Sequence, residues 1–193
     1  MNKPTRRTSK STSDEPSHEA WFSIRVDLVE GRGEHCWPRP GRLIAAAPRH
    51  SFAQLASAID RAFARWDISH LHQFELADGT KIGRPDPDFD EEILDERRER
   101  LSHLHLGEQF VYVFDFGDYW AHLCTVAQEG VDPLEVLGLV PREPIPYFGW
   151  GSIPDQYGRA WDEDDSSSPP PPDPELRDLP PLQPGWGPRA QDA

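Results

Sequence analysis

The chain has 193 residues, a net charge of −14 and two cysteines, Cys36 and Cys124. This length fits a single domain with extensions, and no apolar run approaches the roughly 18 residues of a membrane span. The cysteines lie far apart and in no CxxC pair, which argues against a zinc ribbon or a redox pair, so we expect reduced thiols in a cytoplasmic protein.

The negative charge is spread along the chain. Residues 1–20 hold four basic and three acidic residues and residues 162–193 hold two basic and eight acidic residues, which leaves 23 of the 34 acidic and 14 of the 20 basic residues between them. A surface that binds phosphate backbones normally shows a basic stripe, so direct nucleic-acid binding is disfavoured. An acidic surface either serves solubility alone or suits a protein partner with a basic surface.

Composition divides the chain into three regions. Residues 1–20 are polar, without periodicity and without the apolar segment of a signal peptide, so we expect a disordered basic arm. Residues 21–161 are expected to form one domain. Residues 162–193 are acidic and rich in proline, which predicts a disordered tail with polyproline II character.

The domain begins with elements that local patterns predict. Residues 21–30 alternate apolar and polar side chains as a strand does. Residues 34–47 contain two prolines, which predicts an irregular strand at a sheet edge or a bulge. Residues 51–66 predict the main helix, because Ser51 is a good N-cap and apolar residues recur at helical spacing, with Arg65 on the exposed side.

The next segment alternates histidine and apolar residues. His70 and His72 are expected on one face of a strand that ends at a turn at Asp78-Gly79 and leads into residues 80–82. Residues 84–100 predict an acidic loop whose second half forms a short exposed helix. They lack the glycine and the terminal glutamate of an EF-hand loop.

Residues 110–126, FVYVFDFGDYWAHLCTV, predict the central hairpin. We place a two-residue type II′ turn at Gly117-Asp118, because glycine adopts positive φ without strain. In that register Asp115 faces Trp120, and both share a face with His122. Since both faces are largely apolar, we expect elements packed on each side.

Beyond Val126 the chain is expected to be irregular, with one turn of helix within residues 131–140. Residues 141–161 are dense in aromatic residues and turn formers. We expect this loop to fold back over the sheet near Trp120, where Trp150 and Tyr157 would help to form a groove for a peptide or a small ligand.

The order of these motifs resembles the plasmid pRiA4b open-reading-frame-three-like family, over about residues 20–161. Its most specific pieces are HLHQFEL (70–76), FVYVFDFGDYWAH (110–122) and YFGWGSIPDQYGRAWDEDD (147–165). The resemblance implies a compact α+β domain with no established activity. Some relatives are TnpR-like passenger proteins of insertion elements, which implies an association with plasmids or mobile elements. The cysteine that many members carry near SIPDQYG is absent here.

We therefore expect an α+β fold, a mostly antiparallel sheet with one main helix packed on a face, in a β-grasp-like arrangement and a single domain with disordered tails. A non-enzymatic binding or accessory module is favoured, with no catalytic residue and no cofactor assigned. The alternative is a metal-binding protein or metal-dependent enzyme that uses His70, His72, Asp115 and His122. The candidate ligand-binding residues are His70, His72, Asp115, Asp118, Trp120, His122, Trp150 and Tyr157.

Overall fold

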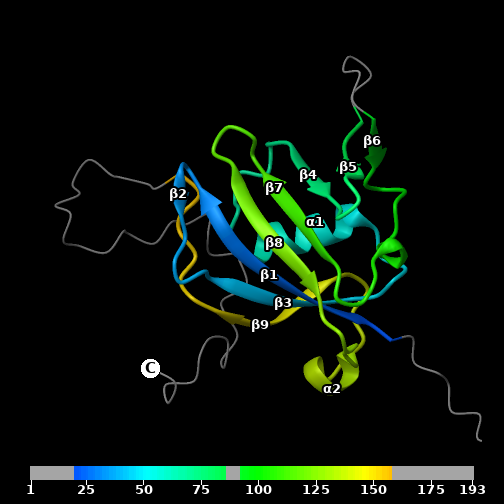
Figure 1. Ribbon diagram of the computed structural model, residues 1–193. Helices are drawn as coiled ribbons and strands as arrows, with labels where there is room; N and C mark the ends of the chain where they lie inside the picture. Colours follow the sequence, from blue (N-terminus) through cyan, green and yellow to red (C-terminus); the bar gives the residue numbers. More distant parts are fainter. Residues whose placement is uncertain (1–19, 86–91, 158–193) are drawn as a thin grey trace, which may run out of the picture.

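A computed structural model describes residues 20–85 and 92–157. The expected arm and proline-rich tail lie outside these residues, apart from Ala20. The described strands form one sheet in the order β6-β5-β4-β7-β8-β1-β3-β9, with β2 paired to β1, and every neighbouring pair is antiparallel except β5 with β6. Figure 1 shows β7, β8 and β1 in the middle of the sheet. This mostly antiparallel sheet with few helices confirms the expected fold class.

The elements have the following bounds. The strands are β1 Phe22–Gly31, β2 Glu34–His35, β3 Gly41–Ala46, β4 His72–Glu75, β5 Lys81–Gly83, β6 Ile93–Asp95, β7 Gln109–Phe114, β8 Trp120–Val126 and β9 Ile145–Trp150. The helices are α1 Phe52–Ala62, α2 Pro133–Leu137 and a 3₁₀ turn, Leu101–His103. In the described part of the chain no helix is long and apolar enough to cross a membrane.

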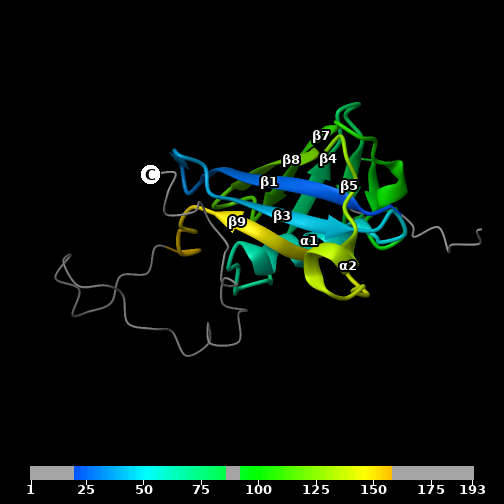
Figure 2. The same ribbon diagram turned by 90° about the horizontal axis from the view of Figure 1, so that it is seen from below.

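The core lies between the sheet and α1, on one face only (Figure 2). Ile24, Val26 and Leu28 of β1 are fully buried there, as their alternation predicts. The helix begins with a capping box in which the Ser51 hydroxyl accepts from the Gln54 amide and the Gln54 side chain accepts from the Ser51 amide. The predicted strand, N-cap and helix are thus confirmed.

The helix ends earlier than its pattern predicts. Ala62 is its last residue, and Ala64 takes a positive φ of 54°, which turns the chain back toward the sheet. Arg65 follows this turn and is only 2% exposed, so its expected exposed position is wrong. Helical spacing stops predicting side-chain directions where the helix stops.

The predicted register of the central hairpin is also wrong. Phe114 pairs with Trp120 and Tyr112 with His122, one residue away from the expected pairing. Asp115 and Tyr119 adopt the positive φ values that a tight turn needs, and Gly117 does not. A slip of one residue moves each side chain to the other face. Trp120 and His122 therefore lie beneath α1, whereas Asp115 lies in the loop.

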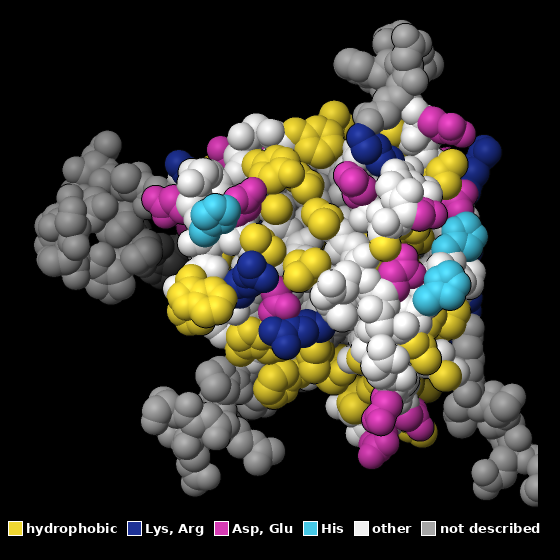
Figure 3. All heavy atoms as spheres, viewed as in Figure 1, with side chains coloured by type: hydrophobic (Ala, Val, Ile, Leu, Met, Phe, Trp, Pro, Cys, Tyr) yellow, Lys and Arg dark blue, Asp and Glu magenta, His cyan; other side chains and the backbone are white. Residues whose placement is uncertain are grey.

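The opposite face of the sheet is partly open. Val111 on β7 and Phe148 on β9 are 38% and 37% exposed there, so the expected cover on both faces is not found in the described part of the chain. Figure 3 views this face, where hydrophobic side chains lie among Arg, Asp and Glu side chains. Near α2, Trp21 and Ala45 form a small second cluster that Leu137 covers.

Several shorter elements also differ from expectation. β3 is an internal strand rather than an edge, because β9 pairs with it and both prolines precede it, but its pairing with β9 is irregular between Leu43 and Ile44, as the alternative of a bulge predicted. Residues 93–95 form a strand instead of a helix, and residues 145–150 form β9 instead of an irregular loop. The turn of helix within residues 131–140 and the turn at Asp78-Gly79 are confirmed, and the histidine strand is confirmed from His72 onward, whereas His70 lies before β4.

Candidate functional site

Three segments meet at the end of the sheet where β1 and β2 are joined. They are the β1–β2 turn, the β7–β8 loop and residues 152–157. The Arg32 amide donates to the Asp118 carbonyl at 2.6 Å, which joins the first two. Between the β1–β2 region and the third segment lies a pocket of about 680 Å³. Its lining residues are Gly31, Arg32, Glu34, His35, Cys36, Trp37, Pro38, Pro40, Trp120, Ser152, Ile153, Pro154 and Asp155.

The pocket is lined by two tryptophans that differ in solvent exposure. Trp37 is 85% exposed, whereas Trp120 is only 2% exposed. The Trp120 indole lies flat against Gly31, where a Cβ would come within 2.0 Å of an indole carbon. Gly31 is therefore required for the close approach of the ring. The pocket thus combines one fixed aromatic wall with one free aromatic side chain.

A buried cation lies behind this wall. The Arg65 guanidinium carbon is 3.7 Å from the centroid of the Trp120 ring, and one Nη donates to the Pro154 carbonyl at 3.5 Å. Burial lowers the pKa of Arg65 to about 10, while the charges of Asp60 and Asp155 act in the opposite direction. Arg65 stays protonated at neutral pH.

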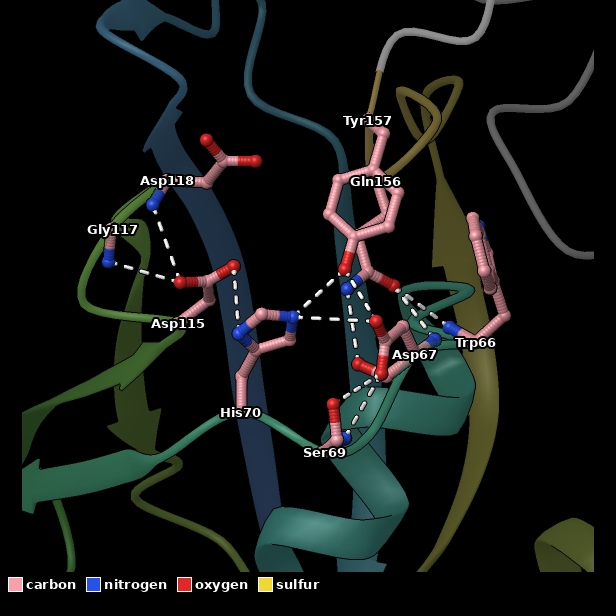
Figure 4. A network of polar contacts seen from close by, with 9 residues as sticks. All are labelled: Trp66, Asp67, Ser69, His70, Asp115, Gly117, Asp118, Gln156 and Tyr157. Atoms are coloured by element: carbon pink, nitrogen blue, oxygen red, sulfur yellow. Dashed lines mark hydrogen bonds and ion pairs between the residues drawn. The ribbon is translucent and has the colours of Figure 1, made fainter.

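Next to the pocket, His70 joins the β7–β8 loop to residues 152–157 (Figure 4). Its Nδ1 is 3.3 Å from Oδ2 of Asp115, and its Nε2 is 2.8 Å from the Tyr157 hydroxyl and 3.4 Å from Oδ2 of Asp67. The Tyr157 hydroxyl donates to that same Asp67 oxygen at 2.7 Å. We call these four side chains the His70 network.

The pKa shifts of Asp67 and Tyr157 suit a structural role better than a catalytic one. Hydrogen bonds from Ser69 and Tyr157 hold the pKa of Asp67 well below its usual range. The bond to Asp67 raises the pKa of Tyr157 to about 12, so the phenol stays neutral and weakly nucleophilic at neutral pH. Both ring nitrogens of His70 have partners, so the side chain connects the β7–β8 loop to Tyr157 and Asp67.

Gln156 completes this attachment. Its side chain is fully buried, its Oε1 accepts from the Trp66 and Asp67 amides at 2.9 and 3.1 Å, and its Nε2 donates to the Asp67 carbonyl at 3.0 Å. These bonds satisfy backbone groups just beyond the end of α1. Residues 152–157 are therefore held in place as one wall of the pocket.

The remaining predicted histidines lie elsewhere. His72 of β4 pairs with Glu96 at 2.5 Å. Nearby, the Tyr112 hydroxyl donates to Asp60 at 2.8 Å. Burial raises the pKa of Asp60 to about 6. His122 is fully buried between the rings of Phe63 and Tyr112, and burial lowers its pKa to about 3.

The proposed cluster of His70, His72, Asp115 and His122 does not form, because the corrected register separates Asp115 from His122. Across residues 20–85 and 92–157, no three His, Cys, Asp or Glu side chains are grouped as metal ligands. Asp118 contributes backbone groups to the loop, since its amide donates to Asp115 and its carbonyl accepts from Arg32.

Trp150 lies apart from the pocket as well. Its ring covers Gly41 on the open face of the sheet and stacks with Arg25 at 4.9 Å, whereas Trp120 lies on the α1 face. The structure therefore brings together His70, Asp115, Asp118, Trp120 and Tyr157, and it separates His72, His122 and Trp150 from them.

Arg65, Asp67, Glu96 and Gln156 were not predicted as site residues. Each is a polar residue whose role depends on partners distant in sequence, for example Gln156 with Asp67. A local signal existed only for Asp67, because an Asp followed two residues later by Ser is typical of a side-chain-capped turn.

Comparisons with known proteins agree with this fold. A family model described as plasmid pRiA4b ORF-3-like protein matches residues 21–137. A crystal structure of a protein of unknown function from Methanosarcina mazei Go1 is similar, with a TM-score of 0.54 and 23% sequence identity over 70% of this chain and 72% of that chain. No curated protein matches.

Proposed function

The chain belongs to the plasmid pRiA4b ORF-3-like family, and we propose that its domain is a non-enzymatic binding module whose ligand occupies the pocket beside Trp37 and Trp120. The observation that carries the proposal is the pocket itself, whose 680 Å³ falls in the range of about 300–1,000 Å³ typical of small-molecule sites. Its lining combines two tryptophans and several prolines with charged and polar side chains, which suits an aromatic ligand that also carries a polar group.

The exposure of Trp37 supports this proposal. A tryptophan that is 85% exposed contributes little to folding, whereas tryptophan is strongly enriched among residues that dominate binding energy. The opposite wall is already fixed by Gln156 and by the His70 network, so little conformational entropy would be lost there on binding.

A non-enzymatic role is favoured because the polar side chains beside the pocket are already hydrogen-bonded to one another. His70 is engaged at both nitrogens, and Tyr157 is held neutral by its bond to Asp67. The metal-dependent alternative receives no support, because in the described part of the chain His70 and Asp115 meet but His72 and His122 lie elsewhere, and no group of three metal ligands forms. Single-domain limits at 21–161, a β-grasp-like arrangement and a cytoplasmic location stay predictions.

A protein partner with a basic surface is our second proposal, since the chain carries a net charge of −14. A role beside the proteins of plasmids or mobile elements, as in the TnpR-like passenger proteins, would supply such partners. Contacts between exposed charges are screened by salt. We expect capture of such a partner to fall steeply as salt is raised, and capture that is insensitive to salt would contradict this proposal.

The experiment for the pocket is a screen of small aromatic compounds by ligand-observed NMR against the wild type and two variants. Trp37→Ala removes the exposed pocket tryptophan, and Phe116→Ala removes an aromatic side chain that is 51% exposed outside the pocket lining. We expect compounds that bind the wild type to bind Trp37→Ala at least about fivefold more weakly, a loss of about 1 kcal/mol. They should bind Phe116→Ala unchanged. Binding that survives Trp37→Ala, or no binding to the wild type, would contradict the proposal.

A further inference from the structure

Among residues 20–85 and 92–157 two arginines are buried, and they differ in how their charge is satisfied. Arg42 is 1% exposed, and its guanidinium donates to the carbonyls of Gly41, Ala62 and Trp150. Arg65 is 2% exposed, yet its Nε and one Nη have no hydrogen-bond partner in the described part of the chain. Its remaining donor reaches a carbonyl only at 3.5 Å.

A buried guanidinium with free donors is unusual, because an unpaired buried charge is strongly destabilising. Stacking on Trp120 stabilises the cation only in part, since it supplies no acceptor for the N–H groups. No carboxylate in the described part of the chain forms an ion pair with Arg65, although Asp60 and Asp155 lie near enough to affect its pKa. The two free donors therefore have no acceptor among residues 20–85 and 92–157, and a bound ligand would supply one.

The position of Arg65 indicates where that acceptor would come from. The guanidinium stacks on Trp120 and contacts Pro154, and both residues line the pocket. Asp155, whose charge also acts on Arg65, lines the same pocket. Arg65 itself is not a lining residue, so it lies behind Trp120 and Pro154, and the Pro154 carbonyl is a weak acceptor for one Nη.

We propose that the pocket binds a small carboxylate ligand, whose carboxylate accepts from the free Nε and Nη of Arg65 and whose apolar part lies against Trp37. This inference rests on the proposed function and adds the chemical class of the ligand. A guanidinium fork matches the two oxygens of a carboxylate, and charge-assisted bonds of this kind are the strong ones. The neutral amide of the same acid presents only one acceptor oxygen and carries no charge.

The test uses matched pairs of ligands with the full-length protein. Each pair is an aromatic carboxylate and its primary amide, such as phenylacetate and phenylacetamide, titrated at constant ionic strength and followed by NMR. We expect the wild type to bind the carboxylate at least about tenfold more tightly than the amide. Arg65→Met should bind the amide as the wild type does and lose the preference, and Arg65→Lys should keep part of it.

Arg61→Met is the control, since Arg61 is an exposed arginine that does not line the pocket. It should retain the carboxylate preference. The assignment is overturned if Arg65→Met keeps the preference, if Arg61→Met removes it, or if the wild type binds both members of each pair equally. Equal binding would leave the pocket proposal intact, whereas failure of every pair to bind would remove both proposals.

A second measurement decides the matter if Arg65→Met does not fold. The thermal unfolding midpoint of the wild type should rise more with each carboxylate than with its amide at equal concentration, because a ligand that binds only the folded state stabilises it. Arg65→Lys should reduce this difference, since a lysine keeps the charge but lacks the fork. An amide that raises the midpoint as much as its acid would overturn the proposal.

Discussion

His122 remains neutral in the folded protein because it is buried beside aromatic rings, which lowers its pKa to about 3. In the unfolded chain a histidine titrates near about 6.5. Between these two values only the unfolded chain binds the proton, so the free energy of unfolding decreases as the pH falls below about 6.5. Each pH unit in this window costs about 1.4 kcal/mol from this group.

His122→Leu tests this residue, since leucine cannot take up a proton. Urea unfolding of both proteins at about pH 7 and about pH 5 should show a smaller loss of stability in the variant at the lower pH, by about 2 kcal/mol. The difference between the two proteins isolates His122 from other titrating groups. Equal losses in wild type and variant would contradict the buried, neutral assignment.

Asp60 should respond to pH in the opposite direction. Its folded pKa is raised by burial to about 6, above its ordinary value of 3.8. The stability that the protonated carboxyl contributes is complete below about pH 4 and is lost as the pH rises through about 6. Asp60→Asn cannot ionise, and its amide oxygen still accepts from the Tyr112 hydroxyl.

We therefore expect Asp60→Asn to gain stability relative to the wild type as the pH is raised from about 4 to about 8, by up to about 3 kcal/mol. Chemical denaturation of both proteins at the two pH values measures this change. A difference between them that does not vary with pH would show that Asp60 is ionised in the folded protein throughout.

At the scale of elements, the β7–β8 loop depends on Asp115. This residue adopts a positive φ of 57°, and its Oδ1 accepts from the amides of Gly117 and Asp118 at 2.9 and 3.3 Å. Asn keeps both properties, Gly keeps only the backbone freedom and Ala keeps neither. Stability should therefore decrease in the order Asn, Gly, Ala, with Asp115→Ala losing about 2 kcal/mol. Thermal unfolding of the three variants measures this order. An alanine variant as stable as the asparagine variant would contradict the role of Asp115 in stabilising the loop.

Elements that depend on neighbouring residues were predictable from the sequence, and elements that depend on distant partners were not. The strand from residue 22, the Ser51 cap and the Asp78-Gly79 turn depend on neighbouring residues, so their local patterns were sufficient. The hairpin register depends on an aspartate in a left-handed conformation, where glycine was the natural choice. β9 pairs with β3 about a hundred residues away, and no local pattern reports such a partner.

The site was predicted only in part for the same physical reason. His70, Asp115, Trp120 and Tyr157 were named because histidine, carboxylate and aromatic residues are frequent ligand contacts, and the fold brings them to one end of the sheet. Arg65 was assigned to the surface because its burial depends on the turn at Ala64 and on the position of Trp120. Burial of a charged residue is a property of the tertiary structure.

At the scale of the whole molecule, we predict that residues 21–161 fold without the flanking regions. The sheet, α1 and the segment that carries Gln156 are all contained in this fragment, so its core is complete. The fragment should unfold cooperatively with a midpoint within about 5 °C of that of the full chain. A fragment that unfolds without cooperativity, or far below the full chain, would contradict these domain limits.

The central claim is that a ligand binds at the pocket formed by the β1–β2 region and residues 152–155. Protein labelled with ¹⁵N at the tryptophan indoles, titrated with a carboxylate that binds, tests it most directly. We expect the Trp37 and Trp120 resonances to shift together with a single dissociation constant, while Trp21 beside α2 and Trp150 on the open face remain unchanged. Shifts confined to Trp21 or Trp150, with Trp37 and Trp120 unmoved, would contradict it.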